Sequence, residues 1–343
     1  MNMRNARAGE AALKAIVLMG AVAFALLLLV AFGLKQSMMP DERLKVRVAP
    51  PRTAFDGKRA FEGLRKLIEA AAGAKAEIDS NPRMIDEVRR AKPVQAMNAV
   101  IKRCLAESGF EISTCGGKAC EEMVIEGVHR GNGDAPLLFA TRQSAGLGDD
   151  PTFAGANANA GAACLMELAR TIGPHWEGIP IVLYFIGTVR EPISETIVPD
   201  TILPFIQWGI RTDEKPAAIV YLSDIGDAYL GVFRDEGAPK WMYALVKDVA
   251  ARQGYRAHFL EGVGKGGLFD EANTLRKDLS SPLLFLADPV YGGTPMDHKR
   301  LWHTSEDTLE QVRAASLQAV GDVLYDVIPL WDRHLKDAKP EKR

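Results

Sequence analysis

The chain has 343 residues, which is enough for one domain of roughly 250–300 residues and an accessory segment. Apolar residues make up 47% of it and charged residues 25%, values of an ordinary globular protein that exclude a wholly disordered chain. A net charge of −2 without a long basic run gives no sign of nucleic-acid binding.

Residues 15–34 form an uncharged, apolar run between Lys14 and Lys35, after a short tail of residues 1–14. A helix of this length, with a rise of about 1.5 Å per residue, spans about 30 Å, the thickness of a bilayer core. A buried core helix would show a polar stripe, and this run has none. A cleaved signal peptide is the alternative, but residues 31–33 match a cleavage site poorly. The run therefore predicts a single-pass anchor whose partner is the lipid bilayer.

Four cysteines give a weaker signal about the cellular compartment. Cys115 and Cys120 enclose a short loop whose glycines would permit the tight turn of a disulfide bond. The main alternative is four unpaired thiols, and a four-cysteine zinc site is disfavoured because no C-x-x-C pair exists. Basic residues stand on both sides of the apolar run, so the positive-inside rule barely discriminates between the two orientations.

A linker rich in proline and charge, residues 35–55, leads to the main domain, residues 56–332, and a polar tail of residues 333–343 follows. Apolar residues at three- and four-residue steps predict helices around residues 61–71 and 97–105. After these, short apolar runs alternate with helical patterns. The runs predict strands at residues 123–128, 137–141, 179–186, 217–222 and 282–287, and the patterns predict helices at 161–172, 241–253 and 309–331.

The predicted strands are continuously apolar, which is typical of strands that are buried on both faces. Their alternation with helices predicts an α/β fold with a mostly parallel sheet and helices on both sides. Sites in such sheets form at the carboxyl ends of the strands. The loops of interest therefore begin at Thr141, Ile186, Leu222 and Ala287.

The segment W-H-T-S-E-D-T at residues 302–308 is the most informative motif of the chain. It resembles the C-terminal metal-ligand motif of a family of zinc-dependent exopeptidases that includes bacterial leucine aminopeptidases and glutaminyl cyclases. Further motifs of that family match upstream in the same order, across residues 56–330. The resemblance implies a three-layer α/β sandwich of the zinc-exopeptidase, phosphorylase/hydrolase-like type. Because the family is mostly secreted or luminal, it also favours a periplasmic main domain.

The first two upstream motifs resemble those of the family but have lost its metal ligands. In the strand of the H-x-D motif, Arg142 stands in the histidine position and Ser144 in the aspartate position. The loop G-A-N-A-N-A-G-A resembles the family's G-A-D-D-N-A-S-G. There Ala158 takes the position of the metal-bridging aspartate, and Asn157 that of its acidic neighbour.

Two later motifs repeat this loss. The family's glutamate pair, a base followed by a ligand, falls on Thr188 and Val189, or on Val189 and Arg190 after a slip of one residue. Glu191 would be a ligand only after a further slip. In the match to L-D-M-I-G-D, Ser223 takes the aspartate position and Asp224 follows one residue late.

Only the final motif keeps its ligand. Residues 268–272 resemble a D-D-H segment that retains Asp270 but has Ala272 in the histidine position, whereas His303 stands unchanged. Zinc in a hydrolase needs about three protein ligands, and alanine and valine have no lone pair to donate. An arginine cannot be deprotonated in a protein and would repel the cation. We therefore expect no bound zinc, no other cofactor and no confidently assigned catalytic residue.

The favoured function is that of a membrane-anchored pseudoenzyme that acts by binding a protein or peptide partner. Arg142 and Arg190 would neutralise Asp224 and Glu191 in an internal salt-bridge network, or would bind a carboxylate or phosphate ligand. A narrower alternative is a metal-free enzyme that uses Arg142 and Asp224.

The main alternative is a metal-dependent aminopeptidase or glutaminyl cyclase with zinc in a rearranged site. The residues available for such a site are Asp224, Glu191, His298 and His303.

Three local expectations complete the sequence analysis. Asp307 and Thr308 are expected to cap a helix that begins at about Leu309. The glycine-rich residues 261–267 lack the spacing of a phosphate-binding loop and predict a flexible loop. Cys164 lies on an apolar helix face and is expected to belong to the core, not to act as a nucleophile.

Overall fold

Within the part of the chain that the structure describes, eight strands form one mixed sheet, and the strands that carry the predicted site lie in its centre. The structure, a computed structural model, describes residues 19, 21–31, 42–46, 52–81, 83–84, 86–115, 124–133, 135–145, 154–173, 176–189, 215–264, 272–273, 275–276, 279–292, 301 and 304–337. The strands are β1 (Glu111–Cys115), β2 (Val124–His129), β3 (Leu137–Ala145), β4 (Ile181–Val189), β5 (Ala218–Ser223), β6 (Val232–Asp235), β7 (Phe259–Gly264) and β8 (Leu283–Ala287). Their order across the sheet is β1-β2-β4-β3-β5-β8-β6-β7.

The centre of the sheet is parallel. Strand β3 pairs in parallel with β4 and β5, and β5 pairs in parallel with β8. Strands β3, β5 and β8 are buried along their whole length, as their continuous apolar sequences predict. The pairs β1–β2, β2–β4 and β6–β8 are antiparallel. The predicted α/β class with a mostly parallel sheet is therefore confirmed.

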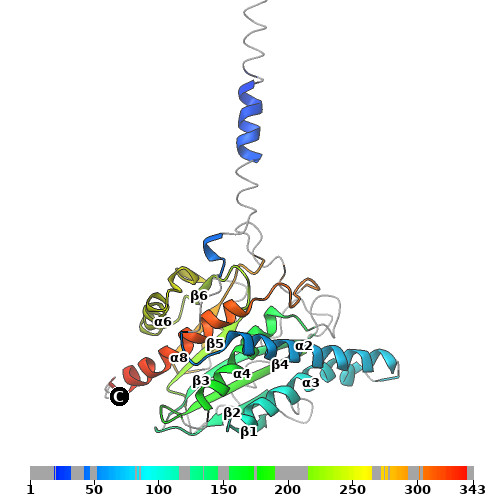
Figure 1. The fold of residues 1–343 in the computed structure, drawn as a ribbon, viewed down its shortest axis with the longest axis vertical. Coiled ribbons are helices and arrows are strands. Elements are labelled where there is room, and N and C mark those ends of the chain that lie inside the picture. The colour runs from blue at the N-terminus through cyan, green and yellow to red at the C-terminus, as the bar shows by residue number, and fades with distance from the viewer. Residues whose placement is uncertain are drawn as a thin grey trace, which may run out of the picture.

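The long helices are α2 (Gly57–Ser80), α3 (Asp86–Glu107), α4 (Ala160–Ile172), α6 (Lys240–Arg252) and α8 (Ala314–Asp337), and the short 3-10 helices are η1 (Glu42–Leu44), η2 (Asn157–Asn159) and η4 (Arg256–His258). Helices α2, α4 and α8 pack against one another over one face of the sheet, and α3 packs beside α2 (Figure 1). A further helical layer on the opposite face, as in a three-layer sandwich, stays a prediction.

A close contact at Gly161 places the start of α4 over the strand ends. A Cβ atom on this residue would lie 2.2 Å from Oγ1 of Thr141, so no larger side chain fits there. The same Thr141 hydroxyl donates a hydrogen bond to the carbonyl of Leu222, at 3.1 Å. Strands β3 and β5 and the first turn of α4 therefore meet at one point, which fixes the geometry of the candidate site.

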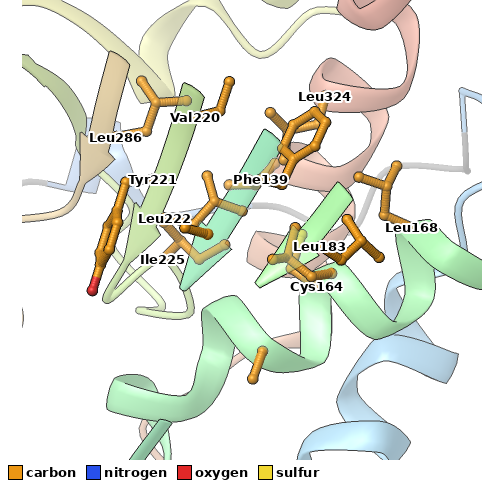
Figure 2. Packing of buried hydrophobic residues seen from close by; sticks show 14 of the residues in the cluster. Phe139, Cys164, Leu168, Leu183, Val220, Tyr221, Leu222, Ile225, Leu286 and Leu324 are labelled. Atoms are coloured by element: carbon orange, nitrogen blue, oxygen red, sulfur yellow. The ribbon is translucent and has the colours of Figure 1, made fainter. Parts of the chain in front are cut away.

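The hydrophobic core lies between the central strands and the helices that cover them. Figure 2 shows that side chains of the sheet and of α4 and α8 pack together; the labelled residues of this cluster are Phe139, Leu183, Val220, Tyr221, Leu222, Ile225, Leu286, Cys164, Leu168 and Leu324. Cys164 is completely buried there, so the expectation that its thiol belongs to the core is confirmed. Burial raises the pKa of this thiol, which disfavours the reactive thiolate.

Some local expectations were wrong. Strands β1, β6 and β7 were not predicted, because they lie toward the edges of the sheet and lack continuous apolar runs. The predicted loop at residues 261–267 is partly strand, since β7 extends to Gly264. Helix α8 begins at Ala314, not at Leu309, because residues 304–312 form a series of turns and a β-bridge.

The predicted anchor is only partly within the described residues. Residues 21–31 are helical and their side chains are exposed. No helix within the described residues combines the length and the apolar character needed to cross a bilayer. The predicted anchor spans residues 15–34. Apart from residues 21–31 and Met19, it lies outside the described residues.

Candidate functional site at the carboxyl ends of the central strands

Strand β3 carries two predicted site residues beyond the point where β5 leaves it. Strand β5 pairs with β3 only as far as Thr141, whereas the pairing of β3 with β4 continues to Ala145 and Val189. Arg142 and Ser144 therefore lie within a strand and not in a loop, which corrects the predicted strand end at Thr141. Both residues are buried, with 6% of their surface exposed.

The side chain of Asn159 takes the place that β5 leaves empty beside Ser144. Its Oδ1 accepts a hydrogen bond from the backbone N–H of Ser144 at 3.1 Å, and its Nδ2 donates to the carbonyl of the same residue at 3.0 Å. The Nδ2 group also donates to the carbonyl of Gly155 at 2.7 Å. One amide side chain thus supplies hydrogen bonds to the backbone groups of β3 that β5 leaves unpaired, and it joins the loop that contains Ala158 to β3.

Asp307 caps the start of η2 and α4, and not the helix that follows it in sequence. Its carboxylate accepts hydrogen bonds from the backbone N–H of Asn157 at 2.7 Å and of Ala158 at 3.3 Å. The hydroxyl of Tyr291 donates to the same carboxylate at 2.5 Å. The prediction that Asp307 would cap a helix at Leu309 is therefore wrong, although its capping chemistry was correctly recognised.

Asp307 is almost completely buried, with 1% of its surface exposed. Burial raises its pKa to about 6, and the negative charge of Asp224 acts in the same direction. The hydrogen bonds from Tyr291 and from the N–H groups of Asn157 and Ala158 lower the pKa and limit this rise. The backbone N–H groups at the start of η2 and α4 are therefore bonded to a carboxyl group whose pKa lies in the mildly acidic range.

Asn157 joins the same loop to the loop after β5. Its Oδ1 accepts a hydrogen bond from the N–H of Gly226 at 2.6 Å. Its Nδ2 is buried and has no hydrogen-bond partner among the described residues, which is costly for a donor that is out of reach of water. An aspartate at this position would accept the same bond from Gly226 but would add a buried negative charge close to Asp307.

Ser223 and Asp224 end strand β5. The Ser223 hydroxyl donates a hydrogen bond to Oδ2 of Asp224 at 2.6 Å. The Asp224 backbone has a φ angle of +54°, a left-handed conformation that is uncommon outside glycine, although aspartate adopts it more readily than most residues. This residue is buried, and its charge raises the pKa of both Asp307 and Asp288.

Several of the described ligand positions carry a residue whose side chain is not a zinc ligand. Ala158 has no donor atom in its side chain, and its backbone N–H is bound to Asp307. Ser144 uses its backbone to bind Asn159, and Arg142 brings a cation to the same end of the sheet. Within the described part of the chain, no group of three or more His, Cys, Asp or Glu side chains could hold a metal ion. The other predicted site residues, Arg190, Glu191, Asp270, His298 and His303, lie outside the described residues, as does the side chain of Val189.

Solved structures show which proteins share this arrangement of strands and helices. A glutaminyl cyclase of an Acidobacteriales bacterium matches with a TM-score of 0.63 and 24% identity, over 84% of this chain and 99% of that protein. A zinc-dependent exopeptidase of Parabacteroides distasonis matches with a TM-score of 0.61 and 18% identity, over 82% of this chain and 99% of that protein. The glutaminyl cyclase of Porphyromonas gingivalis matches with a TM-score of 0.60 and 19% identity, over 83% of this chain and 99% of that protein.

The chain has the fold of bacterial glutaminyl cyclases and zinc-dependent exopeptidases. The family expected from the motifs is therefore the one whose fold is observed. A scan against protein-family models and a search of the curated proteins each found no match. Similarity at these sequence identities shows a shared fold, whereas the chemistry of a protein depends on the residues of its site.

Several residues of this site were not identified from the sequence. Tyr291 had no recognisable signal, and Asn159 stood only as an unassigned position of the matched loop motif, because their roles depend on contacts with residues 16 and 15 positions away in the chain. Asp307 was noticed only as a cap for the wrong helix. Its true partners, Asn157 and Ala158, precede it by about 150 residues, a separation that no local pattern encodes.

Proposed function

We propose that this protein is a pseudoenzyme with the glutaminyl cyclase fold, which binds a protein or peptide partner instead of cleaving or cyclising a substrate. The observation that supports this best is the loop at Ala158. At the position of the metal-bridging aspartate it presents a methyl group, and its backbone is held by an internal carboxylate, Asp307. A site built in this way supplies hydrogen bonds and shape, but not a ligand for a catalytic metal.

The charge balance of the site supports the same proposal. A zinc site keeps several buried carboxylates together because the cation compensates them. Here neutral residues occupy the corresponding positions, namely Ser144, Asn157, Ala158 and Ser223. Arg142 adds a fixed positive charge at the same end of the sheet. These positions therefore add no negative charge that a divalent cation would have to compensate.

The proposal is tested by metal analysis and by activity measurements on the purified chain. We expect less than one equivalent of tightly bound zinc per chain, and no hydrolysis of aminoacyl anilides or cyclisation of N-terminal glutamine that a chelator abolishes. His303→Ala is expected to leave the metal content unchanged, and Ala158→Asp to leave it low, because two ligands do not hold zinc tightly. Stoichiometric zinc, lost together with activity in His303→Ala, would overturn the proposal.

A second candidate function is supported by Asp224. Left-handed backbone at a buried, non-glycine residue is often found at active sites, where the surrounding structure maintains it. In this case the chain is a metal-dependent aminopeptidase or glutaminyl cyclase whose site uses Asp224 in place of the lost aspartate at Ser223. Loss of a chelator-sensitive activity in Asp224→Asn, with unchanged folding by circular dichroism, would establish this candidate.

We also propose that residues 15–34 anchor the protein in a bilayer with the main domain on the periplasmic side. The described part of this run supports the proposal, because its large apolar side chains are exposed; Phe24 is 64% exposed and Leu27 67%. A soluble protein rarely exposes such a row of side chains. The chain is expected to stay in the membrane pellet after alkaline carbonate extraction, and release into the supernatant would contradict the anchor.

Protease added to intact spheroplasts tests the orientation separately. A periplasmic domain is digested without lysis, whereas a cytoplasmic one is digested only after the membrane is opened. Thiol labelling of the unfolded, unreduced chain gives a second readout. A disulfide between Cys115 and Cys120 would leave Cys104 and Cys164, both free thiols in the folded protein, as the two labelled sites.

A further inference from the structure

Two buried aspartates join the loop after β5 to the loop after β8. Asp227 is 4% exposed and Asp288 1% exposed. Each carboxylate accepts one backbone N–H from its own loop and one from the other loop, an arrangement that we name the carboxylate clasp. Asp227 accepts from Tyr229 at 3.3 Å and from Gly292 at 3.2 Å, and Asp288 accepts from Val290 at 2.9 Å and from Gly231 at 2.9 Å.

The clasp is connected to the segment that leads into α8. The backbone of Asp227 forms a β-bridge with Val312, and its carbonyl accepts a hydrogen bond from the Ser316 hydroxyl at 2.6 Å. The neighbouring Gly226 accepts from the N–H of Arg313 at 2.9 Å. The clasp therefore adjoins residues 304–312, which include Asp307 of the candidate site.

The groups around the clasp leave it with more negative than positive charge. They are Asp224 at the end of β5, Tyr291 in the loop after β8, Asp307 bonded to that tyrosine, Arg313 before α8, His258 in η4, whose Nδ1 lies 3.3 Å from the Leu230 carbonyl, and Lys45 over the ring of Tyr229. Arg313 is the cation that lowers the pKa of Asp227. Asp224 acts in the opposite direction on Asp288.

Burial raises the pKa of both carboxyl groups, and the charge of Asp227 raises that of Asp288 further. The backbone N–H donors oppose this effect but do not cancel it. Two interacting buried carboxyls titrate as a unit, so the last proton of the pair leaves at a pH above the ordinary aspartate value of about 3.9. The second negative charge then enters a buried space that already contains the first.

We propose that the carboxylate clasp is a pH-sensitive latch, in which one proton held by the pair keeps the two loops joined and its loss at higher pH lets them separate. The direction of this pH dependence follows from the raised pKa of the two carboxyl groups. A carboxyl that binds its proton more tightly in the folded chain stabilises that state most at low pH. This contribution disappears as the pH rises through the folded-state value. The opening is local, because the β-bridge and the central sheet do not depend on the pair.

Hydrogen–deuterium exchange of the full-length chain in detergent tests the latch. Protection factors, corrected for the intrinsic effect of pH, are measured from pH 5 to about pH 9 for the peptides that contain residues 227–231 and 288–292. We expect their protection to fall progressively as the pH rises. A peptide from β3 serves as the internal reference and is expected to keep its protection.

Variants separate the latch from general destabilisation. Asp288→Asn cannot ionise at this position, so the fall in the protection of both loops with rising pH is expected to be smaller than in the wild-type chain, even where the absolute protection is lower. Asp322→Asn is the matched control, a buried aspartate in α8 whose side chain bonds to neither loop, and it is expected to retain the wild-type pH profile. If the two loops and the β3 reference show the same pH profile in the wild-type chain, the latch is refuted without recourse to any variant.

Discussion

The buried acids of the helical layer and those at the strand ends are stabilised in opposite ways. In the helical layer, Glu167 is completely buried and meets the guanidinium of Arg59 at 2.5 Å. Asp322 accepts five hydrogen bonds, including those from Tyr255 and Gln318. At the strand ends, Asp307 and the clasp aspartates accept mainly backbone N–H groups. The helical layer therefore holds its acids largely with side-chain donors, whereas the acids at the strand ends are held mainly by backbone N–H groups.

The largest expected effect is at Asp322, where the comparison predicts a purely structural role. Asp322→Ala removes the acceptor for buried donors of Thr53, Tyr255 and Gln318. Each unsatisfied donor costs about 1–3 kcal/mol, so we expect a loss of at least about 3 kcal/mol in the free energy of unfolding. Denaturant unfolding measures this loss. As a control, Asp326→Ala removes a single bond from Gln253 and is expected to cost about 1 kcal/mol.

The second prediction concerns the pH dependence of stability at Asp307. Its pKa is raised to about 6 in the folded chain, so its stabilising contribution is complete below about pH 4 and is lost as the pH rises past 6. A shift of about two units corresponds to about 3 kcal/mol. The difference in unfolding free energy between the wild-type chain and Asp307→Asn is expected to change by that order between pH 4 and 7. A constant difference over this range would show that Asp307 is not a titrating group.

Asn157→Asp tests whether the strand ends tolerate another acid. The new carboxylate keeps the bond from Gly226, but it buries a second charge next to Asp307. We expect a loss of about 1–3 kcal/mol in the free energy of unfolding at neutral pH, and a smaller loss at pH 4 where the carboxyl is protonated. The exposed Asn81→Asp is the control and is expected to change stability by less than about 0.5 kcal/mol. An equal loss at both pH values would point to packing instead of charge.

The smallest effect is expected from removal of the N-terminal run. A chain that begins at about Pro40 should fold and remain soluble, and its unfolding free energy should differ by less than about 0.5 kcal/mol from that of the full chain, because the linker separates the run from the core. Gel filtration and denaturant unfolding provide the two measurements. Aggregation of the shortened chain would mean that residues 15–34 belong to the fold, and it would remove the basis for an anchor.

Local sequence patterns determined much of the fold. The apolar runs at residues 137–141, 217–222 and 282–287 identified the buried parallel strands β3, β5 and β8, because a strand covered on both faces is mostly apolar. The ends of α4 and α6 agreed with prediction to within one residue. The order of the motifs predicted the fold of glutaminyl cyclases, and the described motifs around Arg142, Ala158 and Ser223 lie near the carboxyl ends of the central strands.

Only the tertiary structure decided how those strand ends are held together. Asn159 replaces a missing strand partner for Ser144, and Asp307 caps a helix about 150 residues upstream. Asp227 and Asp288 each accept a backbone N–H from the other's loop. Each of these side chains has the chemistry of a local turn or cap, and the sequence reveals that chemistry. Which backbone groups it meets depends on the sheet order, because parallel strands gather their ends from distant parts of the chain. The polar contacts of the site are therefore a property of the assembled sheet, whereas its strands and helices follow from the residues within each segment.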